Sequence, residues 1–207
     1  MRRRGVTAAA RQSIRRSPLL LLGALLLASA GCDRVTQMHG VMIEPPRAVS
    51  AYEFTLSDGK RVSTAAERGR PLLVFFGYTH CPDVCPTTLA DWKRAKEKIG
   101  SDADRVRFVF VTIDPERDTP VLAERYAKQF DASFLGVVGD SATTRRILAD
   151  FGASAAREAA SAVAADSSYS MGHSAQTFLI DDKGRMLAIY PFGIGWEALV
   201  ADLKTIL

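Results

Sequence analysis

The sequence predicts an α/β fold in which a central mixed sheet is covered by helices. Strand patterns alternate with helix patterns along most of the chain, and a strand hairpin followed by a helix ends the series. Two cysteines, Cys81 and Cys85, stand between the first strongly apolar strand pattern and the helix pattern that follows it. A cysteine pair at that place is typical of thioredoxin-like proteins, so we expect a thioredoxin-like domain over residues 51–207.

Length and composition suit one globular domain with additions. Of the 207 residues, 47% are hydrophobic and 24% are charged, which allows a core of ordinary size. The first 32 residues contain six arginines and no acidic residue, and they account for the net charge of +4. Subtracting those six from the 27 basic residues leaves 21 against 23 acidic ones. The rest of the chain is therefore nearly neutral, and we expect no nucleic-acid binding through a basic surface.

The first 32 residues have the features of an export signal. An arginine-rich segment precedes the apolar run "LLLLGALLLASA" over residues 19–30, which is shorter than the ~18 residues of a membrane span. The ending "ASAGC" is similar to a bacterial lipoprotein signal, in which Cys32 is lipidated. Cleavage after "ASA" and an uncleaved anchor are the alternatives. All three predict an extracytoplasmic domain, and we expect it in the periplasm, anchored to the inner (cytoplasmic) membrane.

The next part of the chain leads into the predicted core. Residues 33–50 contain two prolines and no clear period, so we expect a linker before a domain that starts near Ala51. Two short alternating strands follow around the turn Asp58-Gly59. The continuous apolar run over 71–77 predicts a buried central strand, and the spacing of apolar residues predicts a helix over 87–99.

The remaining elements follow in the same alternation. Two apolar runs predict two further strands. A helix pattern follows each strand, one beginning at a proline and the other at a residue suited to cap a helix. A turn at Asp182-Lys183-Gly184 predicts the terminal hairpin. An alanine-rich segment predicts either a helical turn or a mobile loop. The expected ranges are strands over 105–113 and 134–139, helices from Pro120 and over 141–152, the alanine-rich segment over 153–168, the hairpin over 175–193, and a helix over 196–207.

The cysteine pair has three interpretations: a redox pair, a metal clamp or a structural disulfide. A disulfide across so short a loop would stabilise the fold little, which disfavours the third. At a helix N-terminus, unpaired N–H groups and the helix dipole favour the thiolate, which serves as both nucleophile and metal ligand. Redox thioredoxin-like proteins have two residues between their cysteines, whereas three separate Cys81 from Cys85. Both sulfurs could then face one soft ion such as Cu(I).

A third metal ligand is needed, because two thiolates seldom complete a site. The chain has three histidines. His39 lies in the expected linker, and for His80, next to Cys81, we expect a solvated side chain. His173 precedes the strand after the last crossover, and in a thioredoxin-like fold that loop lies beside the cysteine loop. Cys81, Cys85 and His173 are therefore the candidate ligands, and two sulfurs with one imidazole suit copper as Cu(I) or Cu(II).

Three motifs, "FFGYTHCPDVCPTTL", "VTIDPERDTP" and "GHSAQTFLID", together resemble the Sco/SenC family, copper-binding thioredoxin-like proteins that assist assembly of cytochrome c oxidase. The resemblance covers about residues 51–207. It implies that Cys81, Cys85 and His173 bind copper, and that Asp114 supports the site or contacts a partner. The family often has an aspartate directly before the histidine, where this chain has Gly172.

We therefore expect a monomeric, membrane-anchored copper chaperone. It would pass copper by ligand exchange to the copper-bearing subunit of cytochrome c oxidase or to another periplasmic copper protein. The alternative is a thiol–disulfide oxidoreductase, in which Cys81 attacks a partner's cysteines, Cys85 resolves the mixed disulfide, and His173 tunes the thiolate. A thiol peroxidase is a third class, for which the sequence indicates no peroxide pocket.

Overall fold

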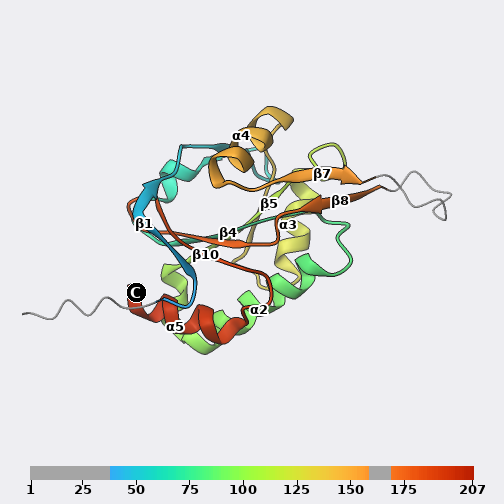
Figure 1. The fold of residues 1–207 in the computed structure, drawn as a ribbon. Coiled ribbons are helices and arrows are strands. Elements are labelled where there is room, and N and C mark those ends of the chain that lie inside the picture. Colours follow the sequence, from blue (N-terminus) through green and yellow to red (C-terminus); the bar gives the residue numbers. More distant parts are fainter. Residues whose placement is uncertain (1–37, 159–168) are drawn as a thin grey trace, which may run out of the picture. The chain divides into compact units, whose positions relative to one another are not determined.

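A six-stranded mixed sheet forms the centre of the fold (Figure 1). The computed structural model describes residues 38–158 and 169–207, and the strand order of this sheet is β1-β10-β9-β4-β5-β6. Strands β4, β5 and β6 run parallel to one another, whereas β9, β10 and β1 each run antiparallel to their neighbours. The predicted mixed sheet with flanking helices is confirmed.

The elements mostly fall where the sequence predicts them. The strands are β1 (Val41–Ala48), β2 (Glu53–Thr55), β3 (Arg61–Ser63), β4 (Leu72–Gly77), β5 (Arg107–Thr112), β6 (Leu135–Val137), β7 (Ala155–Glu158), β8 (Ser170–His173), β9 (Thr177–Ile180) and β10 (Arg185–Tyr190). The helices are η1 (Thr64–Glu67), α2 (Val84–Ile99), η2 (Gly100–Arg105), α3 (Pro120–Lys128), α4 (Ser141–Phe151) and α5 (Trp196–Ile206).

Two apolar cores lie on the two faces of the sheet. Because side chains alternate along a strand, Leu73 and Phe75 of β4 pack with Trp92 in the core beneath α2 and α5. Val74 and Phe76 point the other way, into the core that α4 covers. Figure 1 shows α2 and α5 on one side of the sheet and α4 on the other. β4 is thus buried on both faces, as its continuous apolar run predicts.

The sheet begins earlier than the expected boundary at Ala51. Residues 41–48 form β1, an edge strand on β10, and its register shifts between Met42 and Arg47, where both prolines lie. Proline cannot donate to the strand ladder and is confined to edges and bulges, so no alternating pattern marks this strand. The expected linker is therefore wrong for residues 41–48. The expected export signal and Cys32 lie outside the described residues.

Two other elements differ from expectation. Helix α2 begins at Val84, three residues before the predicted start at Thr87, and this places Cys85 in its first turn. Residues 155–158 of the alanine-rich segment are neither helix nor loop but form β7, which pairs with β8. Helix propensity is a weak preference that tertiary pairing overrides. Residues 159–168 lie outside the described part of the chain. Within that part, no helix is both long enough and apolar enough to span a membrane.

Candidate metal centre

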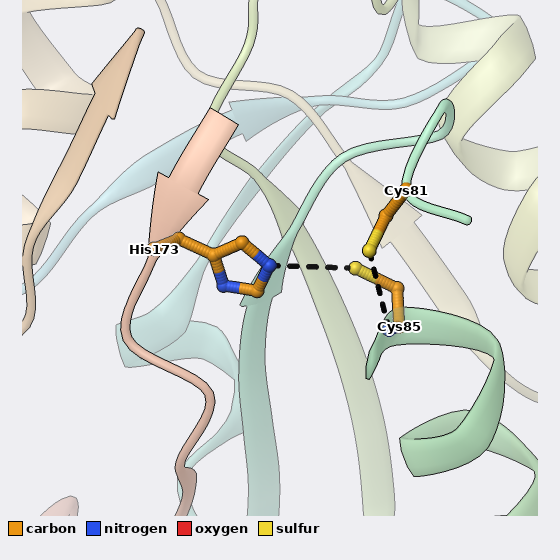
Figure 2. A group of neighbouring side chains, drawn as sticks. All are labelled: Cys81, Cys85 and His173. Carbon is orange, nitrogen blue, oxygen red and sulfur yellow. Dashed lines mark hydrogen bonds between the residues drawn. The ribbon is translucent and has the colours of Figure 1, made fainter. Parts of the chain in front are cut away.

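Three separate elements bring Cys81, Cys85 and His173 together (Figure 2). Cys81 lies in the loop after β4, Cys85 in the first turn of α2, and His173 at the end of β8. One donor atom from each residue lies within 4.8 Å of the other two. Among the described residues this is the only such cluster of potential metal ligands. The structure thus places side by side the three residues that the sequence singles out.

The two cysteines have opposite electrostatic environments. Cys81 is half-buried, whereas Cys85 is fully buried, and the two sulfurs are not bonded to each other. The Cys85 side chain lowers the pKa of Cys81 to about 3, although burial opposes this shift, and the Cys85 backbone N–H donates to the Cys81 sulfur at 3.4 Å. The Cys81 side chain, together with burial, raises the pKa of Cys85. Without metal, the site therefore combines a thiolate at Cys81 with a protonated thiol at Cys85.

Hydrogen bonding and aromatic contacts orient the His173 ring. Nδ1 lies 2.9 Å from the Ser174 carbonyl oxygen, so in the neutral ring Nδ1–H donates there and Nε2 keeps its lone pair. Nε2 lies 3.7 Å from the Cys85 sulfur. The ring meets Phe75 and Tyr78 edge-on, at centroid distances of 5.8 and 5.9 Å. The imidazole is therefore held with its free nitrogen toward the sulfurs.

The protonation of His173 depends on its neighbours. Burial acts to lower the pKa of the ring, but hydrogen bonds to Cys81 and to the Ser174 carbonyl outweigh burial and raise it. An imidazolium beside a thiolate is the expected consequence at moderately acidic pH. A metal ion would replace the proton on Nε2 and the proton on the Cys85 sulfur, so its binding releases protons.

Gly77, the last residue of β4, makes room for the Cys85 sulfur. A Cβ atom at this position would lie 2.7 Å from the Cys85 Sγ and 2.7 Å from the Phe110 ring. Any side chain there would therefore displace the sulfur or the core behind it. Sequence reasoning missed this role, and the signal available was a glycine directly after an apolar strand run.

The buried carboxylate of Asp118 holds the cysteine loop through hydrogen bonds. Its carboxylate is 1% exposed and accepts hydrogen bonds from the Thr79 amide at 2.9 Å and from the hydroxyls of Thr79 and Thr112 at 2.5 Å each. Thr79 stands two residues before Cys81, so the loop is tied to the end of β5. Asp118 lies within the motif "VTIDPERDTP", but nothing in the sequence separates it from Glu116, an exposed acid of the same motif.

Asp114, for which the family resemblance implies either a supporting or a docking role, is buried beside the segment that leads to His173. It is 3% exposed, and its carboxylate binds the Arg117 guanidinium at 2.5 Å and the Tyr169 hydroxyl at 2.7 Å. A buried carboxylate is not available as an exposed docking group, so that alternative is corrected. Asp114 instead connects the loop after β5 to the residue that precedes β8.

The other two histidines lie outside the cluster. His80 is exposed, and its Nδ1 lies 3.1 Å from the Thr79 hydroxyl, which agrees with the expected solvated side chain. His39 Nδ1 lies 2.8 Å from the buried Asp202 carboxylate. The donor set is thus two sulfurs and one imidazole, a combination that suits soft and borderline metal ions such as copper and zinc. The half-buried Cys81 leaves one side of the site accessible to a partner's ligand.

The chain is similar to known proteins over most of its length. The family model described as SCO1/SenC matches residues 41–207. An SCO2-like protein of Rickettsia prowazekii is 32% identical over 153 residues, which are 74% of this chain and 74% of the relative. The solution structure of apo Sco1 from Thermus thermophilus is 35% identical with a TM-score of 0.73, covering 84% of this chain and 99% of that one.

A second solved structure was determined with its metal. Bradyrhizobium japonicum ScoI with copper bound is 35% identical to this chain, with a TM-score of 0.69, and the match covers 78% of this chain and 99% of that one. The family match begins at residue 41, where the structure places the first strand of the sheet.

Proposed function

The chain belongs to the SCO1/SenC family, and we propose that it is a copper chaperone that binds one copper ion through Cys81, Cys85 and His173. The observation that carries the proposal is the convergence of two sulfurs and one imidazole nitrogen within 4.8 Å. Thiolates select Cu(I), and imidazole also suits Cu(II), so this donor set accommodates both oxidation states. The copper-bound relative, 35% identical to this chain, supports copper as the cargo.

The proposed receiver is the copper-bearing subunit of cytochrome c oxidase, whose assembly the family assists. Transfer would proceed by ligand exchange, in which a donor atom of the receiver replaces one chaperone ligand at a time. Cys81 is the natural first ligand to be replaced, because it is half-buried on a loop whereas Cys85 is fully buried in a helix. The proposal includes a periplasmic location at the inner membrane with a lipid anchor at Cys32, and the export-signal features of residues 1–32 support it.

Copper binding by the full-length chain tests the proposal. The protein is reduced, purified in detergent without oxygen and loaded with copper, and stoichiometry and visible spectrum are measured for wild type and His173→Ala. We expect one copper per chain and a thiolate-to-Cu(II) charge-transfer band that the variant lacks. His80→Ala is the matched control, because His80 adjoins Cys81 but lies outside the cluster, and it should behave as wild type.

A thiol–disulfide oxidoreductase is the second candidate, favoured by the low pKa of Cys81 beside a protonated Cys85. This pairing provides an attacking thiolate and a resolving thiol. His173→Ala separates the two functions, since it should abolish tight copper binding and spare much of the disulfide exchange. A wild-type chain that retains no copper but forms a readily reducible Cys81–Cys85 disulfide would replace the chaperone proposal with this one.

A further inference from the structure

His173 lies on a small sheet that is separate from the central one. Among the described residues, strands β7 and β8 pair only with each other, from Ala155 opposite His173 to Glu158 opposite Ser170. A two-stranded sheet on its own is marginally stable, so its position depends on contacts with the rest of the protein. We call this two-stranded sheet, β7 and β8, the histidine arm.

Two hydrogen bonds join the two strands of the histidine arm to each other at its His173 end. The Ser174 amide donates to the Ser154 carbonyl, and the Ser154 amide donates to the Ser174 hydroxyl, each at 2.9 Å. These bonds hold the two strands to each other just outside the arm. They join one side of the arm to the other, and Ala155 and Met171 pack against the core that α4 covers, so the opposite end of the arm is held by a separate contact.

Tyr169, directly before β8, provides that contact. Its ring centroid lies 3.6 Å from the guanidinium carbon of Arg117 and 3.8 Å from that of Arg157. These distances are too short for both groups to share one face, so the two guanidinium groups stack on opposite faces of the ring. The Tyr169 hydroxyl donates to Asp114 at 2.7 Å, and its carbonyl accepts from Arg117 at 2.9 Å.

Two of the residues that hold Tyr169 belong to the loop after β5, which is also bonded to the cysteine loop. Asp114 and Arg117 follow β5, as does Asp118, which binds Thr79 of the cysteine loop. Arg157 belongs to β7 and is itself paired with Glu116 of the same loop at 2.6 Å. One loop, residues 113–119, is therefore bonded to both halves of the metal site.

We propose that Tyr169 is a positioning residue for His173: clamped between Arg117 and Arg157, it holds the histidine arm at the distance from the cysteine loop that a three-ligand metal site needs. The effect on metal binding rests on the proposed function. The position of His173 in the metal-free protein does not, because it depends on the chain alone. Tyr169 touches no metal ligand in the arrangement described, so its effect passes through the arm.

The first test measures the accessibility of His173 without metal. Full-length wild type, Tyr169→Ala and Tyr169→Phe are reduced, kept metal-free and treated with diethylpyrocarbonate, and the modified histidines are located by mass spectrometry. We expect several-fold faster modification of His173 in Tyr169→Ala, relative to His80 of the same molecule. Tyr169→Phe keeps the stacked ring and should stay close to wild type.

The second test measures Cu(II) affinity for the same proteins. Removal of a residue that orients a metal ligand typically weakens binding by about 10–100-fold, and we expect a loss of that order in Tyr169→Ala together with a weaker charge-transfer band. Ser170→Ala is the matched control, because the Ser170 hydroxyl donates to Glu158 within the arm, and it should leave both readouts unchanged. Arg157→Ala removes one of the two guanidinium groups that stack on Tyr169, at an exposed position. It should raise the His173 modification rate and weaken Cu(II) binding, as Tyr169→Ala does.

Wild-type rates and affinity in Tyr169→Ala would overturn the inference, as would an equal loss in Ser170→Ala. If Tyr169→Ala fails to fold by circular dichroism, Arg157→Ala decides between the same two outcomes. If wild type binds no copper, the proposed function fails, and the modification rates of the metal-free chains still decide whether Tyr169 positions His173.

Discussion

At the scale of single residues, the site depends on an unequal pair of cysteines. Helix α2 buries Cys85 and leaves Cys81 half-exposed in the loop before it. The Cys85 thiol is then the donor that keeps Cys81 ionised, so the acidity of one sulfur depends on the protonation of the other. The three-residue spacing was visible in the sequence, whereas the burial of Cys85 and the 3.4 Å contact of its backbone N–H with the Cys81 sulfur follow only from the packing.

This asymmetry predicts the pH dependence of alkylation. The thiolate fraction rises with pH through the pKa, so a Cys81 pKa of about 3 means that its reaction with iodoacetamide is already near its plateau at pH 5. Cys85→Ala removes the thiol donor, and the rise in reactivity should move to clearly higher pH. Peptide mass spectrometry across a pH series measures the rate at Cys81.

Cys85→Ser is the control for that series, because a serine hydroxyl retains a donor toward Cys81. It should keep more of the low-pH reactivity of Cys81 than alanine does. If wild-type Cys81 reacted at pH 5 as slowly as an ordinary free cysteine, the proposed role of Cys85 as its hydrogen-bond donor would be wrong.

The site residues that could be predicted from the sequence are those whose side-chain type itself binds metal. Cys81, Cys85 and His173 are scarce donor types in a chain with three cysteines and three histidines, so their pattern was visible. Gly77, Asp118 and Tyr169 are common residue types whose roles arise from neighbours distant in sequence. The glycine at the end of an apolar run was visible, but not that it accommodates Cys85, and a tyrosine that stacks on Arg117 leaves no local pattern.

At the scale of elements, the loop between β5 and α3 joins the parts of the site. Asp118 binds the cysteine loop through Thr79, and Asp114 binds the histidine arm through Tyr169. Its motif was recognised in the sequence, but as a place for one supporting carboxylate. The structure shows two buried carboxylates with different partners.

Removal of the Asp118 carboxylate should therefore loosen the cysteine loop. Asp118→Ala leaves the Thr79 amide and the Thr79 and Thr112 hydroxyls without their acceptor, and a lost buried partner costs about 1–3 kcal/mol. We expect a decrease of that order in the free energy of unfolding of the metal-free protein, measured with urea. Glu116→Gln changes an exposed acid of the same loop and should stay within about 0.5 kcal/mol of wild type. An equal effect of both changes would contradict this role of Asp118.

Element prediction failed at β1 and β7 for one physical reason. β4 carries a continuous apolar run because both its faces are buried, and that pattern is readable. β1 is an exposed edge strand with two prolines, and β7 is an exposed strand of a separate sheet. Strands that bury little are specified by their partners, β10 and β8, and not by their own periodicity.

At the scale of the whole described domain, a buried carboxylate joins its first residues to its last helix. Asp202 of α5 is 2% exposed and accepts hydrogen bonds from the amides of His39 and Gly40, at 2.8 and 3.1 Å, and from the His39 ring. The sequence indicated neither this bond nor an ordered segment before Ala51. It fastens the beginning of β1, the strand through which the expected membrane tether enters the domain.

Asp202→Ala should loosen this entry without damaging the metal site. The two amides lose a buried acceptor, so we expect faster hydrogen exchange in residues 38–48, measured by mass spectrometry, and a loss of about 1–3 kcal/mol in unfolding free energy. β10 and β9 separate β1 from β4, so copper stoichiometry and the charge-transfer band should be retained. Glu197→Ala changes an exposed acid on the same helix and serves as the control. Unchanged exchange in residues 38–48 would show that β10 alone holds β1. A lost copper band would show that β1 and the metal site are coupled across the sheet.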